Sequence, residues 1–200
     1  MSLTGERHDL WPTPVLMRRV QAPAGYNTQL KDLILARQAR AAGVAAGVVD
    51  ADKTRSDLLR WEDPLIDVLR GWILDVAGSM NAQVGAGRNA VGEDVDMVAE
   101  AWAVAYHEWG YHNLHSHHDS AWSGVYYVHT GQIVEGSGHI EFLDPRPAAC
   151  AREARRNPLH AIPPEPGMLL AFPSWLQHWV TPYEGDSHRI CVAFNIGFER

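Results

Sequence analysis

The sequence has 200 residues and a formal net charge of −7, with 46% hydrophobic and 20% charged residues. This balance describes a globular chain with a substantial core and excludes an intrinsically disordered one. The negative charge and the lack of a basic run argue against nucleic acid as a general partner.

The sequence also bears on the compartment in which the protein works. Cys150 and Cys191 are the only cysteines, so no disulfide framework is expected. The most apolar stretch, residues 41–49, is too short to span a bilayer, and the N-terminus lacks the apolar core of a signal peptide. We therefore expect a soluble, cytoplasmic protein with no membrane partner.

Residues 1–96 predict helices. Residues 27–42 alternate apolar and basic side chains with the period of an amphipathic helix. Residues 63–83 place apolar side chains at three- and four-residue spacing, and their opening Asp-Pro supplies an N-cap and a first-turn proline. The Gly- and Asp-rich residues 85–96 predict a loop. We expect this region to support the core that follows.

From residue 97 the pattern changes to the alternation of β-strands. Segments rich in Val, Tyr, Trp, Phe and Ile predict strands at 98–107, 123–130, 138–143, 168–173 and 188–198. Short strands separated by turn residues predict a sandwich or barrel such as a jelly roll over residues 97–200. Residues 148–159 predict a helical insertion, either a substrate lid or a plain surface helix. The chain is expected to form one mainly β domain with N-terminal helices.

Histidines gather in one part of this second half. Six of the eleven lie between His107 and His129, a clustering that core packing does not explain. Two histidines and a carboxylate can occupy one face of an iron ion and leave the opposite face open. Because side chains on a strand alternate, positions 117 and 119 point to the same side. The sequence predicts His117 and Asp119 as iron ligands, joined by His178 from a distant strand.

The nature of the metal depends on what stands beside it. Arg189 offers a fixed cation, which a cosubstrate with a free carboxylate requires. Zinc is the competing ion, and a zinc hydrolase would need a general base such as Glu135 or Glu141. Arg189 favours an iron-dependent oxygenase. The alternative is a metal-binding β-barrel that is not an oxygenase, either a zinc hydrolase or isomerase or a ligand sensor.

Several motifs together resemble a known family. They are LWPTP at 10–14, HSH at 115–117, SGVYYV at 123–128, GHIEFLDPR at 138–146, PGMLLAFPSWLQH at 166–178 and RICVAFN at 189–195. The chain resembles the 2-oxoglutarate/iron(II)-dependent oxygenase superfamily, and more narrowly a bacterial and phage group of oxygenases within it.

The resemblance implies a double-stranded β-helix, the cupin-like form of the jelly roll. It also implies a dioxygenase that uses iron(II), 2-oxoglutarate and O2 and hydroxylates its substrate with release of succinate and CO2. Arg189 would bind the distal carboxylate of 2-oxoglutarate. Tyr127 would place its hydroxyl beside that carboxylate, or else serve as a core tyrosine.

The resemblance leaves the set of ligands open. The narrower group repeats a His-x-His pair, here His115 and His117, whereas the superfamily at large uses His-x-Asp. This chain satisfies both patterns, so the ligands are either His117, Asp119 and His178 or a set that contains both His115 and His117. An anionic ligand helps to hold iron(II), which favours the first set.

The expected partner is a small-molecule substrate. A compact domain without a recruitment module favours an amino acid or a biosynthetic intermediate over a peptide. Exposed tryptophans on a sheet edge would allow a homodimer, although no spacing in the sequence requires one.

Overall fold

The computed structural model describes residues 12–87, 95–146 and 158–199. Its elements are β1 (Leu16–Arg19), α1 (Tyr26–Gln38), β2 (Val48–Lys53), the 3-10 helix η1 (Leu58–Arg60), α2 (Pro64–Val84), β3 (Met97–His115), β4 (Trp122–His129), β5 (Ile140–Leu143), β6 (Leu159–Ile162), β7 (Met168–Pro173), β8 (His178–Val180) and β9 (Arg189–Phe198). The helical insertion predicted at 148–159 lies, except for its last two residues, outside the described part.

The two predicted helices are present, and α2 begins and ends for local reasons. The Asp63 carboxylate accepts a hydrogen bond of 3.0 Å from the backbone N–H of Leu65, and Pro64 occupies the first helical position. The helix ends at Gly85, whose φ of 65° is a left-handed conformation that favours glycine. The buried face of α2 then packs with α1 against the sheet.

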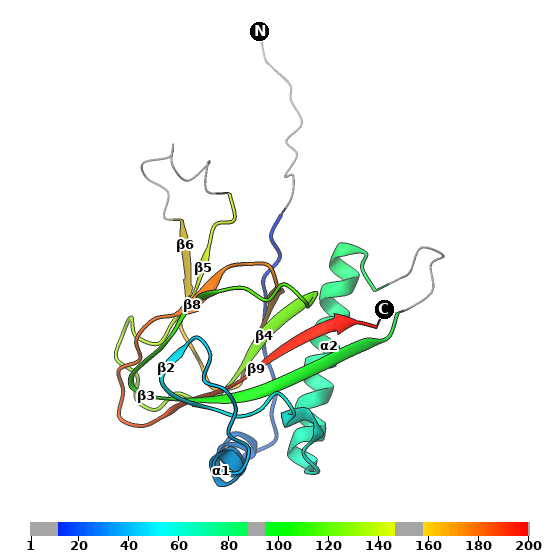
Figure 1. Ribbon diagram of the computed structural model, residues 1–200. Helices are drawn as coiled ribbons and strands as arrows, with labels where there is room; N and C mark the ends of the chain where they lie inside the picture. The colour runs from blue at the N-terminus through cyan, green and yellow to red at the C-terminus, as the bar shows by residue number, and fades with distance from the viewer. Residues whose placement is uncertain (1–11, 88–94, 147–157, 200) are drawn as a thin grey trace.

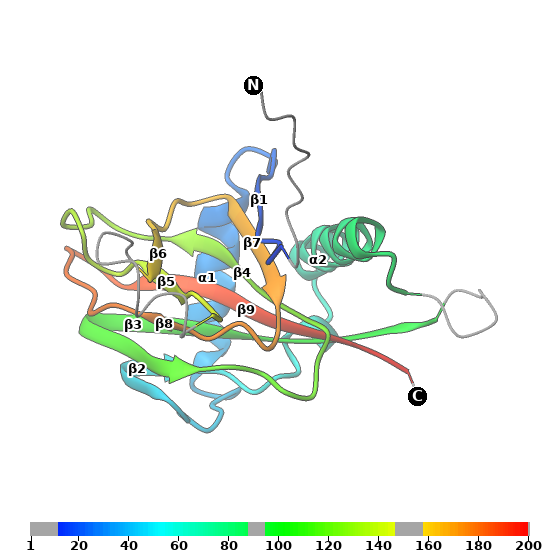
Figure 2. The same cartoon turned by 90° about the horizontal axis from the view of Figure 1, so that it is seen from above.

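The strands form one curled antiparallel sheet in the order β1-β7-β4-β9-β3-β8-β5-β6, with β2 paired to β3 (Figure 1). The long strand β3 joins its two halves: residues 97–106 pair with β9, and the part beyond His112 pairs with β8. Trp109, with φ of 67°, lies where β3 changes partners. Seen from above, β5 and β6 lie on the side of the sheet away from α2 (Figure 2).

Alternating side chains divide the apolar residues into two layers. On β4, Tyr126 and Val128 pack in the cluster formed with the helices, whereas Val125 and Tyr127 belong to the cluster inside the roll. The same alternation holds on β3 and β9, so every second residue of these strands points inward. This inner face carries the candidate site.

Three strands were not predicted, β1, β2 and β6, and β8 was expected only as the strand of His178, without bounds. The four have three to six residues each, and β2 ends in the polar run Asp-Ala-Asp-Lys. Such segments carry little alternation of their own and are held by pairing to longer neighbours. Residues 1–96 therefore supply two strands to the sheet as well as the supporting helices.

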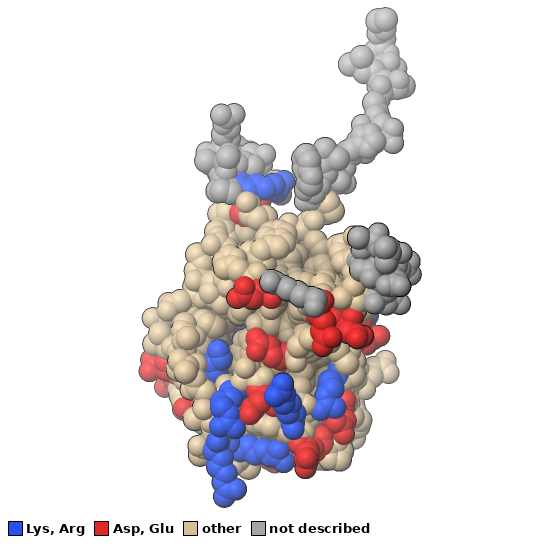
Figure 3. Space-filling view, turned by 45° about the vertical axis from the view of Figure 1, so that its right-hand side comes forward, with Lys and Arg blue, Asp and Glu red and all other residues tan. Residues whose placement is uncertain are grey.

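The surface of the described part carries both signs of charge. On the face in Figure 3, basic side chains gather in the lower part and acidic side chains lie beside and above them. Among the described residues, none of the helices is long and apolar enough to cross a membrane.

Candidate active site

Three histidines converge inside the roll. Ligand nitrogens of His115, His117 and His178 all lie within 4.8 Å of one another. His115 and His178 are cross-strand partners on β3 and β8. His117 lies just past the end of β3, where its backbone N–H donates to the carbonyl of Ser174 at 2.8 Å. Strand pairing and one backbone hydrogen bond thus bring residues from distant parts of the sequence together.

Two of these rings are oriented by hydrogen bonds to backbone carbonyls. Nδ1 of His115 lies 2.7 Å from the carbonyl oxygen of Asn113, and Nδ1 of His178 lies 2.8 Å from that of Leu176. A carbonyl only accepts, so in each ring Nδ1 carries the proton and donates it. The lone pair of Nε2 is left free, which is the arrangement found in metal-binding histidines.

The three histidines are neutral at physiological pH. Burial lowers the pKa of His178 to about 3 and that of His117 to about 4, and it also lowers the pKa of His115. Mutual repulsion between the imidazoles adds to the effect on His117 and His178. Neutral imidazoles can bind a cation without first losing a proton.

Asp119, predicted as the carboxylate ligand, lies outside this group of three. β3 ends at His115, and residues 118–119 form a turn, so the alternation expected to carry Asp119 to the side of His117 does not continue. The Asp119 side chain is exposed and lines a surface depression that also includes Arg55 and Glu100.

A buried cation lies at the other end of the same cavity. Arg189 is only 1% exposed, and its guanidinium carbon lies 4.8 Å from the ring centre of Tyr106 and 5.1 Å from that of Tyr127. Nη1 donates to Sγ of Cys191 at 3.7 Å, while Nε has no partner. No carboxylate among the described residues forms an ion pair with Arg189.

Tyr127 presents a second unsatisfied group beside this cation. Its hydroxyl is buried and has no hydrogen-bond partner within the described residues. Burial raises the pKa of Tyr127, so the hydroxyl keeps its proton and can donate. An acceptor between Tyr127 and Arg189 would satisfy both groups.

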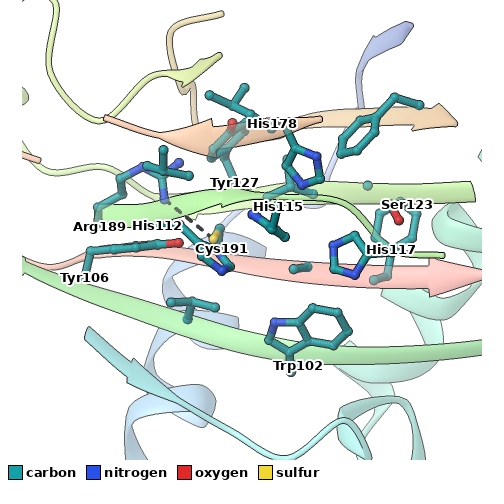
Figure 4. Close-up of a pocket in the computed structure, with 18 residues that line it drawn as sticks. Trp102, Tyr106, His112, His115, His117, Ser123, Tyr127, His178, Arg189 and Cys191 are labelled. Atoms are coloured by element: carbon teal, nitrogen blue, oxygen red, sulfur yellow. Dashed lines mark hydrogen bonds between the residues drawn. The ribbon is translucent and has the colours of Figure 1, made fainter. Parts of the chain in front are cut away.

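One cavity connects the histidines to Arg189. Figure 4 shows the three imidazoles pointing toward one another at one end, with Arg189, Tyr106 and Tyr127 at the other. The walls between them are mostly apolar. They include Val104, Val125, Ile140, Phe172 and Val180. This arrangement fits an elongated ligand that binds a metal at one end and carries an anion at the other.

Comparison with known proteins identifies the family. The family described as "Putative 2OG-Fe(II) oxygenase" matches residues 100–195, which contain all of the predicted site residues. Over these 96 of its 200 residues the chain is similar to the 2-oxoglutarate/iron(II)-dependent oxygenase superfamily. Oxygenases of this family use iron(II), 2-oxoglutarate and O2. Comparison with curated protein sequences gives no match.

Solved structures share the fold of this chain. A prolyl-4-hydroxylase from Pseudomonas putida is 18% identical with a TM-score of 0.65, and the match covers 93% of this chain and 92% of that one. HygX from Streptomyces hygroscopicus, with nickel and 2-oxoglutarate bound, is 12% identical with a TM-score of 0.61 over 92% and 83%. The viral collagen prolyl hydroxylase vCPH from Paramecium bursaria Chlorella virus-1 is 12% identical with a TM-score of 0.58 over 91% and 94%. The predicted jelly roll is confirmed.

Sequence reasoning overlooked some residues of the oxygenase site. Trp102 and Tyr106 line the cavity from β3, and the alternation of that strand was the signal that could have found them. His112, which the sequence already marked as a neighbour of the ligands, lines it too, with its ring centre 3.9 Å from that of His115. In the described part of the chain, neither Glu135 nor Glu141 lines the cavity, which removes the two candidates for a general base.

Proposed function

We propose that the protein is an iron(II)- and 2-oxoglutarate-dependent dioxygenase that hydroxylates a small molecule and releases succinate and CO2. One observation carries the proposal: a fully buried Arg189, unpaired by any described carboxylate, shares a cavity with three convergent neutral histidines. The two ends of the cavity match the two ends of 2-oxoglutarate, whose keto acid binds a metal and whose distal carboxylate needs a cation.

Arg189 supports this proposal on energetic grounds. A guanidinium removed from water without an anion is strongly unfavourable, because its lost hydration is not replaced. The two flanking tyrosine rings offset part of this cost through cation–π attraction. A carboxylate from a bound molecule would offset the rest through charge-assisted hydrogen bonds, assisted by the hydroxyl of Tyr127.

The histidines fit an iron ion. We assign His115, His117 and His178 as its ligands, since their nitrogens form one group and Asp119 does not belong to it. Imidazole nitrogen is a suitable ligand for iron, and three ligands on one side leave positions open for 2-oxoglutarate and oxygen. Zinc also accepts three histidines, but it gives no role to the buried arginine.

The residues of the chain bind the cosubstrate, orient the metal ligands and exclude water. Arg189 and Tyr127 fix the distal carboxylate of 2-oxoglutarate, and the hydrogen bonds from His115 and His178 to the backbone fix the imidazoles. Phe172 packs its ring 4.7 Å from that of His178 and forms an apolar wall beside the ligands. When bound, iron(II) and 2-oxoglutarate supply the oxidation chemistry, which these residues only position.

Hydroxylation of a small molecule is the finer part of the proposal. The structural neighbours include prolyl hydroxylases, one of them from Trichoplax adhaerens in complex with a peptide fragment, and HygX with hygromycin B bound. The enclosed cavity and its buried lining favour a compact substrate over an extended chain.

The test is an anaerobic titration of metal-free protein with iron(II) and then with 2-oxoglutarate, followed by the weak visible band of a chelated keto acid. We expect the band in the natural protein, a weakened band in Arg189→Met, and no change in the control Arg60→Met, which alters an exposed arginine of η1. Iron binding without a band would contradict the proposal. If the band appears, candidate substrates are screened for succinate release, and activity with peptides alone would overturn the small-molecule part.

A further inference from the structure

Two polar groups, one lining the metal end of the cavity and one beside it, have no role in binding iron or 2-oxoglutarate. They are the indole N–H of Trp102 and the ammonium group of Lys53. Trp102 lies on β3 and Lys53 on β2, where Lys53 pairs with Val104. Paired residues share a face of the sheet, so Lys53 stands on the inner face with Trp102 and Val104.

Trp102 has an unsatisfied donor in the cavity. It is 6% exposed, and its Nε1 is buried without a hydrogen-bond partner in the described residues. The indole ring lies 6.1 Å from the ring of His117, away from Arg189 and Tyr127 at the other end (Figure 4). A buried N–H without an acceptor is unfavourable, so this position calls for an acceptor from a bound molecule.

Lys53 supplies a positive charge next to that donor. Its Nζ lies 4.5 Å from the centre of the Trp102 ring, and the side chain is half-buried. Within the described ranges no carboxylate forms an ion pair with it. Lys53 thus lies next to a residue that lines the cavity.

We propose that Lys53 and the indole N–H of Trp102 bind a carboxylate of the substrate beside the metal. This inference rests on the proposed function and names the substrate class: small molecules with a free carboxylate. One oxygen would accept from the ammonium group and the other from the indole.

Arg189 in the cavity and Lys53 beside Trp102 suit two different ligands. Arg189 is fully buried between two aromatic rings, which fits a cosubstrate common to every turnover. Lys53 is half-buried and has a flexible stem, which fits a substrate that must enter and leave. The sequence contains fifteen arginines but only one lysine besides Lys53, namely Lys31 on α1. Lys31 therefore offers a matched control.

The test compares carboxylates with their neutral amides. Full-length protein carrying 15N-labelled tryptophan is loaded with zinc(II), which keeps the spectrum diamagnetic, and with 2-oxoglutarate. The probes are benzoate against benzamide and phenylacetate against phenylacetamide. The Trp102 indole signal is assigned from Trp102→Phe. We expect each carboxylate to shift this signal and to bind about tenfold more tightly than its amide, as for a hydrogen bond to a charged group.

Two substitutions complete the test. Lys53→Met keeps the length of the stem and should abolish the preference for carboxylates, whereas Lys31→Met should retain it. Equal binding of carboxylates and amides, no shift of the Trp102 signal with any probe, or an unchanged preference in Lys53→Met would each overturn the inference. So would a weaker iron–2-oxoglutarate band in Lys53→Met, because Lys53 would then bind the cosubstrate. A missing band in the natural protein contradicts the proposed function instead, so the two failures are distinguishable.

Discussion

The amide nitrogen of Asn195 lies 3.4 Å from Nδ1 of His117. The same nitrogen donates to the Glu100 carboxylate at 3.2 Å, while the amide oxygen accepts from the Ser123 hydroxyl at 2.8 Å. Asn195 and Glu100 are cross-strand partners on β9 and β3. His117 lies beyond the end of β3, where strand pairing no longer holds the backbone. The contact with Asn195 therefore helps to position the His117 ring.

Replacement of Asn195 by Ala should weaken iron(II) binding about tenfold, because the side chain that holds the His117 ring in place is lost. Anaerobic titration of the metal-free protein measures the affinity. Asn113→Ala is the control, because the Asn113 side chain is exposed and only its backbone carbonyl contacts a ligand. Equal affinities for the two variants would show that Asn195 does not position His117.

His115 and Asp119 distinguish the two sets of ligands. If iron is held by three histidines, His115→Ala should reduce iron(II) affinity more than Asn195→Ala does, and Asp119→Ala should leave it nearly unchanged. The reason is that Asp119 is exposed in a turn while His115 is within 4.8 Å of the other two ligands. The same titration gives the answer, and the reverse order of effects would restore Asp119 as a ligand.

Tyr127→Phe should have opposite effects on stability and on cosubstrate binding. The buried hydroxyl has no partner, so its removal should leave the metal-free protein unchanged or stabilise it by about 1 kcal/mol, measured by urea unfolding. Binding of 2-oxoglutarate should weaken about tenfold, because a donor to its carboxylate is lost. A destabilised variant with unchanged 2-oxoglutarate binding would make Tyr127 a core tyrosine.

The long helices and strands could be predicted from the sequence. The positions of the site residues relative to one another could not. α2 carries a strong periodic pattern and β7 is a continuous apolar run, and both were predicted nearly to the residue. β8 has three residues and gains its order from pairing with β3 and β5. His178 was expected from a motif. Asp119 lies outside the group of three histidines because of a turn at 118–119, which strand alternation alone does not predict.

The residues found only in the structure act through tertiary contacts. Asn195 and Trp102 lie on the predicted strands, but their importance depends on what faces them across the roll. Lys53 lies on a short polar strand whose pairing with β3, beside Trp102, has no signal in the residue pattern. Side-chain alternation assigns a residue to a face; the curl of the sheet decides which residues of that face meet.

The metal-free protein should lose stability as the pH falls below about 6.5, the usual pKa of histidine in an unfolded chain. Burial lowers the folded-state pKa of His178 to about 3 and of His117 to about 4, so the unfolded chain takes up protons first. The stability is complete above pH 6.5 and is lost toward these lower values. Urea unfolding at pH 7.5 and 5 measures the difference, which should be smaller in His178→Asn and unaltered in His118→Gln, an exposed position.

Gly124 lies where β4 is closest to its neighbours. It pairs with Ala171 of β7 on one side and Phe194 of β9 on the other, and a Cβ at this position would overlap the Phe194 ring and the Leu170 carbonyl. Gly124→Ala should therefore destabilise the protein by about 1–3 kcal/mol or more, because neither strand can move without breaking its pairing.

The matched control for Gly124 is Gly78 on α2, where an added Cβ meets nothing within 4 Å. Gly78→Ala should stabilise the protein by about 0.5–1 kcal/mol, since alanine loses less conformational freedom in a helix than glycine. Urea unfolding of both variants measures the two changes. Opposite signs would show that the glycine of the SGVYYV motif is required for close strand packing beside the site, whereas stabilisation in both variants would mean that β4 has room for a side chain there.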